Sequence, residues 1–191
     1  MDAEGLTLAC ATRAEASVAR RRGLRTEIVG LAASRGIPDG RLVSFGVAGA
    51  LHEGLHCGDV IDATRVVDED GETLWEGGPL GAAGARPGTI VAAGLVVDGV
   101  AERRRLHERT RADAVDMESG ELARSGRLVG VVRAISDTPA RPLGPLGSAL
   151  RPDGSLDWPQ LARAAAQPRT TGRAFLGIKR ALRRLGESVA K

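Results

Sequence analysis

Two acidic residues follow short apolar runs and could do chemistry where a strand ends. Glu118 comes just after Ala114–Asp116, and the pair Ser136-Asp137 comes after the run 129–135. In an open α/β sheet, ligands bind outside the carboxyl ends of the strands, so a carboxylate at either place would face a cleft. A third run leads into small residues that predict a glycine-rich turn, Gly46-Val47-Ala48-Gly49. We expect these segments to meet at one edge of a sheet.

Strands that alternate with helices must position these residues. The patterns predict strands at 6–11, 25–29, 42–45, 58–67 and 89–97, a helical turn at 31–35, helices at 12–22, 100–110 and 173–189, and loops at 77–88 and 141–157. This order is typical of an α/β architecture. The run 58–67 alternates less than an edge strand would, so we expect it at the centre of the sheet.

The composition predicts one soluble domain. A chain of 191 residues with two Phe, two Trp and no Tyr must build its core from Val, Leu, Ile and Ala. Cys10 and Cys57 lack metal-ligand spacing and are expected to be buried free thiols, as in a cytoplasmic protein. The start of the chain lacks a secretory pattern, and the longest apolar run is too short to span a bilayer. We expect no metal and no cofactor.

The charge is concentrated near the end of the sequence. Residues 169–191 hold seven basic residues and one acidic residue, whereas the rest of the chain carries −3. No aromatic residues alternate with the basic ones, so we expect no nucleic-acid partner. Apolar residues recur there at helical spacing, namely Phe175, Ile178, Leu182, Leu185 and Val189. The stripe could pack on the domain, or the helix could lie on an anionic membrane surface.

Four segments of the chain form a recognisable set in their order. They are Ser44-Phe45-Gly46-Val47-Ala48-Gly49-Ala50-Leu51, Gly58-Asp59-Val60, Asp116-Met117-Glu118 and Val132-Arg133-Ala134-Ile135-Ser136-Asp137. In this order they resemble the motifs of the nucleoside phosphorylase/nucleosidase superfamily, and most of all its methylthioadenosine/S-adenosylhomocysteine nucleosidase branch. Residues 150–154 and the basic helix are similar to the hopanoid-associated phosphorylase members, which are thought to release adenine from adenosylhopane. The resemblance spans nearly the whole chain.

The resemblance implies a fold and an assembly. We expect a single domain over residues 1–191 with a three-layer phosphorylase-like α/β fold, in which helices flank a mixed central sheet. The segment between Glu15 and Leu42 is short, and the region from Trp75 to Pro87 lacks a helix, so the fold is trimmed relative to the family. The resemblance also implies a homodimer, and a cytoplasmic protein that is peripheral to the inner face of the membrane if the basic helix binds lipid.

The resemblance assigns roles to individual residues. Asp137 matches the acid that protonates N7 of the purine, and Glu15 matches the general base for the attacking water. Glu118 matches the carboxylate that binds the ribose hydroxyls. The other implied substrate-binding residues are Met117, Ser136, Val47, Ala48, Gly49, Val96 and Val97. These types suit N-ribosyl cleavage, which develops positive charge on the sugar and negative charge on the departing base.

Simpler interpretations of the same residues remain open. Glu15 and Glu118 could be charges at helix starts, and Ser136-Asp137 could be a cap after a strand. The expected function is hydrolysis of an adenosyl compound (adenosylhopane-like, methylthioadenosine or S-adenosylhomocysteine) with release of adenine. A phosphate-dependent phosphorylase and a non-catalytic nucleoside-binding homologue are the alternatives. A hydrolase requires Glu15 to reach the cleft that Glu118 and Asp137 share.

Overall fold

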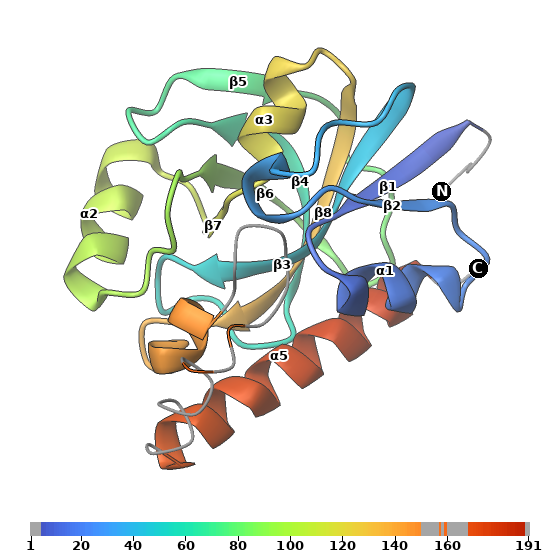
Figure 1. Ribbon diagram of the computed structural model, residues 1–191. Helices are drawn as coiled ribbons and strands as arrows, with labels where there is room; N and C mark the ends of the chain where they lie inside the picture. Colours follow the sequence, from blue (N-terminus) through green and yellow to red (C-terminus); the bar gives the residue numbers. More distant parts are fainter. Residues whose placement is uncertain (1–4, 150–156, 158, 160–167, 190–191) are drawn as a thin grey trace.

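The computed structural model describes residues 5–149, 157, 159 and 168–189. These residues form an eight-stranded mixed sheet that is covered by helices (Figure 1). The strands are β1 (Leu6–Cys10), β2 (Thr26–Ile28), β3 (Arg41–Ala50), β4 (Val60–Val67), β5 (Thr73–Glu76), β6 (Arg86–Ala92), β7 (Ala114–Asp116) and β8 (Leu128–Asp137). The helices are α1 (Arg13–Arg20), η1 (Leu31–Ala33), α2 (Val100–Thr110), α3 (Ser119–Arg124), η2 (Gly144–Ala149) and α5 (Pro168–Ser188). The expected α/β class is confirmed.

The sheet closes on itself at its centre. Its order is β2-β1-β3-β7-β6-β4-β5, and β8 pairs with both β3 and β4. Strands β3, β8, β4, β6 and β7 therefore form a ring, in which β8 runs parallel to β3 and antiparallel to β4. β7 runs antiparallel to β3. β4 is central, as its sequence predicts, because it pairs with β5, β6 and β8.

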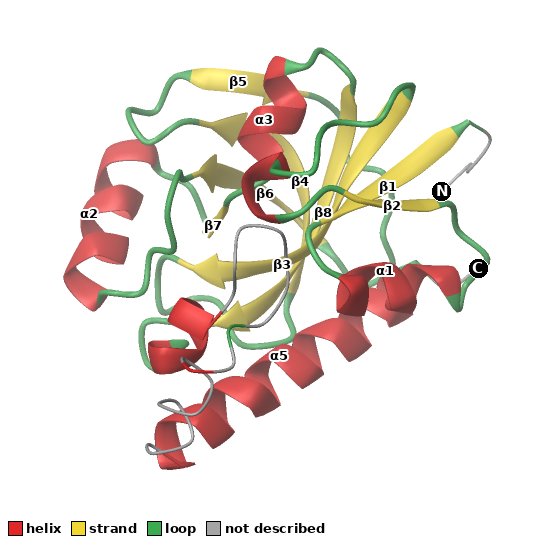
Figure 2. Cartoon of the chain, viewed as in Figure 1, coloured by secondary structure: helices red, strands yellow, loops and turns green. Residues whose placement is uncertain are grey.

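Helices cover the outside of the curved sheet (Figure 2). Helices α1 and α5 lie together on one side, where Ala16, Ala19, Ala181 and Leu185 pack against strand residues such as Phe45. Helix α3 lies on the opposite side in the figure. Helix α2 stands beside β7, and its Leu106 is in a cluster with Leu51, Val91 and Val97. Cys10 and Cys57 are buried free thiols, as expected.

Two predictions about the strands are wrong in detail, and one strand was not predicted. The segment Gly46-Val47-Ala48-Gly49 is part of strand β3 and not a turn, because β8 pairs with it as far as Gly49. The strand expected at 89–97 begins earlier, at Arg86, and ends at Ala92, where its neighbour β7 also ends. Strand β5 was not expected; it forms an antiparallel hairpin with β4 across the turn at 68–72.

The C-terminal helix was expected at 173–189 and is observed as α5, from Pro168 to Ser188. The side that packs on the sheet carries small residues and one large one, namely Ala174, Gly177, Ala181 and Leu185. A β-carbon at Gly177 would overlap the carbonyl oxygen of Ser136, so glycine permits close contact with the end of β8. Phe175, which the packing interpretation placed inside, is 62% exposed.

Two further sequence predictions concern residues 150–154 and the membrane. Residues 150–154, which support the resemblance to hopanoid-associated proteins, lie outside the described residues. Across the described ranges, no helix has the length and apolar character needed to cross a membrane.

Candidate active site

All ten site residues predicted from the sequence line one cavity with a volume of about 120 Å³. They are Glu15, Val47, Ala48, Gly49, Val96, Val97, Met117, Glu118, Ser136 and Asp137. The rest of the wall is mostly apolar and consists of Ala11, Leu31, Leu95, Val115 and Leu143, together with the polar residues Thr12 and Asp116. The structure therefore brings together residues that are up to 122 positions apart in the chain, between Glu15 and Asp137. Their chemical roles stay predictions.

Strand β3 lies between the two strands that carry the acids. Gly49 pairs with Val115 of β7 on one side and with Asp137 of β8 on the other. From the sequence we expected the acids to meet at one edge of an open sheet. This expectation is wrong, because β7 is antiparallel to β3 whereas β8 is parallel to it. The acids meet instead over the C-terminal half of β3.

Glu15 begins helix α1 and also faces the cavity. Its Oε2 accepts hydrogen bonds from the backbone N–H of Thr12 at 2.7 Å and from Thr12 Oγ1 at 2.8 Å. This is a capping box, so the local interpretation as a helix-start charge is correct. Its Oε1 accepts a hydrogen bond from the backbone N–H of Val47 at 2.9 Å. The carboxylate is buried, and Glu15 lines the same cavity as Glu118 and Asp137, as a hydrolase requires.

Arg133 holds the second group of carboxylates. This arginine is buried, and its Nη2 lies 2.6 Å from Asp116 Oδ2 and 3.2 Å from Glu118 Oε2. The pKa of Glu118 is raised to about 8, chiefly by burial; Arg133 opposes the rise, and the carboxylates of Asp116 and Glu15 contribute to it. The single guanidinium of Arg133 faces the three carboxyl groups of Asp116, Glu118 and Glu15. Glu118 therefore retains a proton near neutral pH.

A strained turn supports the other oxygen of Glu118. The backbone N–H of Ala32 donates to Glu118 Oε1 at 3.2 Å. Ala32 and Ala33 have φ values of 49° and 55°, which are unfavourable for residues with a β-carbon. Such strain costs ~1–3 kcal/mol per residue and concentrates at functional sites. The short length of this segment is visible in the sequence, but its contact with Glu118 was not predicted.

Asp137 is held by a neighbour and by a distant arginine. Its Oδ1 accepts a hydrogen bond from Ser136 Oγ at 2.6 Å. Its Oδ2 forms an ion pair with Nη2 of Arg103, which extends from α2 and is completely buried. Arg103 was not predicted from the sequence. Its burial could have been predicted from its spacing, because it lies on one face of the helix with Leu106 and Thr110, which are both buried.

The two glycines of β3 each make room for one carboxylate–arginine pair. A β-carbon on Gly46 would overlap Glu15 Oε1, and it would lie 2.5 Å from Arg133 Nη1. A β-carbon on Gly49 would lie 2.8 Å from Asp137 Oδ2 and 3.2 Å from Arg103 Nη1. The spacing that looked like a turn therefore serves close packing of charged groups against a strand.

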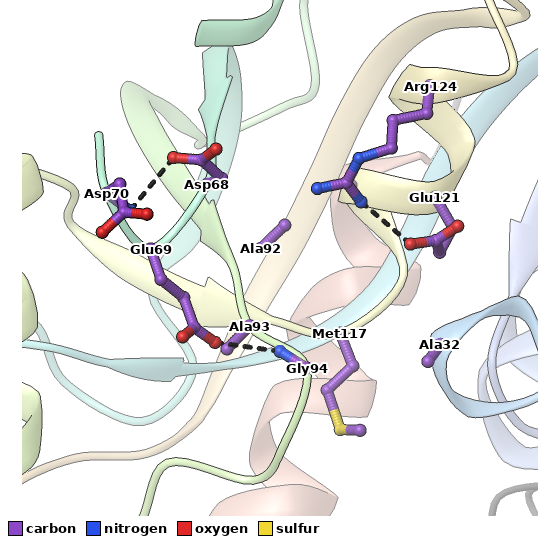
Figure 3. Close-up of a pocket in the computed structure, with 11 residues that line it drawn as sticks. Ala32, Asp68, Glu69, Asp70, Ala92, Ala93, Gly94, Met117, Glu121 and Arg124 are labelled. Carbon is purple, nitrogen blue, oxygen red and sulfur yellow. Dashed lines mark hydrogen bonds and ion pairs between the residues drawn. The ribbon is translucent and has the colours of Figure 1, made fainter. Parts of the chain in front are cut away.

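A second cavity of about 430 Å³ adjoins the first, and Met117 lines both (Figure 3). In Figure 3, Met117 lies between Ala32 and the segment that contains Gly94. Glu69 belongs to the turn between β4 and β5, and it accepts a hydrogen bond from the backbone N–H of Gly94 at 3.0 Å. This bond connects the turn to the segment after β6, and both line the second cavity. Within the part of the chain that the structure describes, no group of three His, Cys, Asp or Glu residues could hold a metal ion.

No protein-family model matches the chain, and no curated protein matches it in sequence. Solved structures do share its fold. The S-adenosylhomocysteine nucleosidase of Streptococcus pyogenes, in complex with 5-methylthiotubericidin, has a TM-score of 0.61 and 17% identity, over 100% of this chain and 99% of its own. The 5′-methylthioadenosine/S-adenosylhomocysteine nucleosidase of Colwellia psychrerythraea, in complex with adenine, has a TM-score of 0.58 and 12% identity, over 97% of each chain.

The futalosine hydrolase of Helicobacter pylori has a TM-score of 0.54 and 14% identity, over 96% of each chain. Identities this low establish the fold and not the activity. The mixed α/β fold expected from the resemblance is therefore confirmed, and it is the fold of these nucleosidases.

Proposed function

We propose that the protein is a purine nucleosidase, which hydrolyses the N-ribosidic bond of an adenosyl compound and releases adenine. The observation that carries the proposal is the meeting of Glu15, Glu118 and Asp137 at one cavity, each held by buried hydrogen bonds or ion pairs. The shared fold with nucleosidases, one of them bound to adenine, supports it.

The reaction would use the three carboxyl groups in different ways. Asp137 gives its proton to N7 of the purine, which leaves with the electron pair of the C1′–N9 bond. Glu15 takes a proton from water as the water oxygen bonds to C1′. Glu118 accepts hydrogen bonds from the ribose hydroxyls while positive charge develops on the sugar. General acid–base catalysis of this kind contributes ~10²–10⁴-fold in each step.

We propose water and not phosphate as the nucleophile. Among the described residues that line the cavity, none is Lys or Arg. The nearby Arg103 and Arg133 are buried and paired with carboxylates. Adenine release should therefore proceed in phosphate-free buffer and yield free sugar. Dependence on phosphate, with a sugar 1-phosphate as product, would instead establish a phosphorylase.

Chromatography of the products from a panel of nucleosides tests the proposal directly. The panel should contain 5′-methylthioadenosine, S-adenosylhomocysteine and an adenosine with a large apolar 5′ group. We infer a preference for the last, adenosylhopane-like compound, because apolar residues such as Leu31, Leu95 and Leu143 complete the cavity wall. If adenine binds to the protein but is not released from any of these compounds, the protein is a non-catalytic nucleoside-binding homologue.

Exposed apolar residues beside the cavity support a homodimer. Leu95, in the segment that joins β6 to α2, is 78% exposed, and Val100, the first residue of α2, is 58% exposed. Burial of such residues against a second copy would remove apolar surface from water. Sedimentation analysis at micromolar concentration, with Leu95→Ser as the variant, tests this assembly. A monomer that is fully active would contradict it.

We also propose that the protein is cytoplasmic and binds the inner face of the membrane peripherally through α5. A groove of about 810 Å³ lies between α1 and α5. Its apolar residues are Val18, Phe175, Ile178 and Leu182, and its basic residues are Arg21, Arg22, Lys179 and Arg183. Apolar side chains with a basic border suit the interface of an anionic membrane.

A further inference from the structure

We propose that Arg103 is a positioning residue for Asp137, and that Asp98 couples this pair to the segment that covers the cavity. The inference rests on the proposed function, in which Asp137 meets the purine. Arg103 itself does not line the cavity and would act only through Asp137.

Arg103 joins three parts of the chain at one guanidinium group. Nη1 donates to the carbonyl oxygen of Ala50, the last residue of β3, at 2.8 Å. Nη2 pairs with Asp137, the last residue of β8, and with Asp98 Oδ1 at 3.2 Å. The ends of two neighbouring strands and the loop before α2 are therefore held in a single arrangement.

This arrangement is costly for a residue that only stabilises the fold. Arg103 is 0% exposed, and its Nε has no hydrogen-bond partner in the structure. A buried charge pair is often no better for stability than apolar residues of similar volume, and an unpaired buried donor adds a further cost. The next residue, Arg104, is exposed and pairs with Glu108 on the same helix. The burial of Arg103 is thus specific to one position on α2.

Asp98 extends the network to the wall of the cavity. Its Oδ1 accepts a hydrogen bond from the backbone N–H of Leu143, and its Oδ2 accepts one from Gly144, both at 2.8 Å. Leu143 lines the cavity that contains Asp137. One carboxylate therefore holds both the guanidinium behind the acid and the segment in front of it.

The network has one consequence for the chemistry. Arg103 and Ser136 each occupy one oxygen of Asp137, so they restrict rotation of the carboxyl group and give its remaining lone pairs a fixed direction. Arg103 would thus support the orientation of the acid toward the purine.

Steady-state adenine release from 5′-methylthioadenosine and calorimetric binding of adenine test the inference together. We expect Arg103→Met to lower kcat by ~10²-fold, with a much smaller change in KM, and to weaken adenine binding by ~10-fold. Arg103→Lys restores a cation and should recover part of both losses. Arg104→Met is the matched control on the same helix and should behave as the wild type. A purely structural role would lower thermal stability without this separation of kcat from KM.

The outcomes separate this inference from the proposed function. If the wild type releases adenine and Arg103→Met matches Arg104→Met, the proposed function stands and the positioning role is wrong. If the wild type neither releases nor binds adenine, the proposed function fails, and the inference falls with it. Should Arg103→Met not fold, Asp98→Asn replaces it, because it keeps Arg103 and removes only the bridging charge. Unchanged kcat and unchanged adenine binding in a folded Asp98→Asn variant would also overturn the inference.

Discussion

Gly49 lies directly against the carboxylate of Asp137, so that a β-carbon at position 49 would be 2.8 Å from Asp137 Oδ2. The two residues also pair across β3 and β8. Asp137 cannot move aside easily, because Ser136 and Arg103 hold its two oxygens. The glycine therefore determines where the carboxyl group stands relative to the cavity.

Gly49→Ala is expected to displace Asp137 and lower adenine release by ~10–100-fold, because small misplacement of a reacting group has effects of this size. Gly78→Ala is the matched control, since a β-carbon there meets nothing within 4 Å. Steady-state kinetics of both variants measure the effect. Normal turnover by Gly49→Ala would show that the pair adjusts freely.

Asp137→Asn should lower kcat by ~10²–10⁴-fold, because an amide cannot transfer a proton to N7 of the purine. The volume of the side chain is nearly unchanged, so the circular dichroism spectrum should match that of the wild type. Asp39→Asn serves as the control, because the side chain of Asp39 is almost fully exposed. A folded Asp137→Asn variant with normal turnover would assign the acid role to another group.

Glu15→Gln should lose turnover and also stability. The carboxylate accepts hydrogen bonds from the backbone N–H groups of Thr12 and Val47 on its two oxygens. The amide NH₂ group of glutamine would face one of these donors, and a buried unsatisfied group costs ~1–3 kcal/mol. Urea denaturation measures this loss, and product chromatography measures turnover. A variant that keeps its activity would exclude Glu15 as the base.

Glu118→Gln is expected to change how stability depends on pH. The pKa of Glu118 in the folded protein, about 8, lies above its ordinary value of 4.5, so the folded state binds the proton more tightly than the unfolded chain. The stabilisation from this proton is complete below pH 4.5 and is lost as the pH rises through 8. Glutamine stays neutral, so the variant should gain stability relative to the wild type at alkaline pH, by up to ~5 kcal/mol.

Urea denaturation at about pH 5 and about pH 9 tests this sign. The stability difference between Glu118→Gln and the wild type should grow with pH. Glu121→Gln, on the exposed face of α3, should show no such trend. A difference that stays constant as the pH rises would mean that Glu118 is ionised throughout this range.

Membrane contact should depend on both the apolar and the basic side chains of the α1–α5 groove. Phe175→Ser removes an exposed apolar residue, and Arg183→Glu reverses an exposed charge, without disturbing the buried side of α5. Each variant should reduce co-sedimentation with anionic vesicles. High salt should release the wild type from the vesicles, because each basic residue near the surface contributes ~1 kcal/mol of electrostatic attraction. Equal binding to neutral and anionic vesicles, or no binding by the wild type, would return this surface to an ordinary role.

The sequence alone indicated the acids of the candidate site. Local patterns were enough for two of them, because Asp137 ends an apolar strand and Glu118 follows another. The local pattern of Glu15 indicated only a charge at a helix start, and the family resemblance added it to the site.

Only the tertiary structure decided which partners hold these acids. Residues 103–105 are three consecutive arginines with the same local character, yet Arg103 alone is buried, because α2 packs through Leu106 and turns that face toward Asp137. The role of Gly49 likewise depends on β8 and α2, which are distant in the sequence. Buried ion pairs and close packing join segments whose proximity arises only when the sheet closes, so no local pattern can specify them.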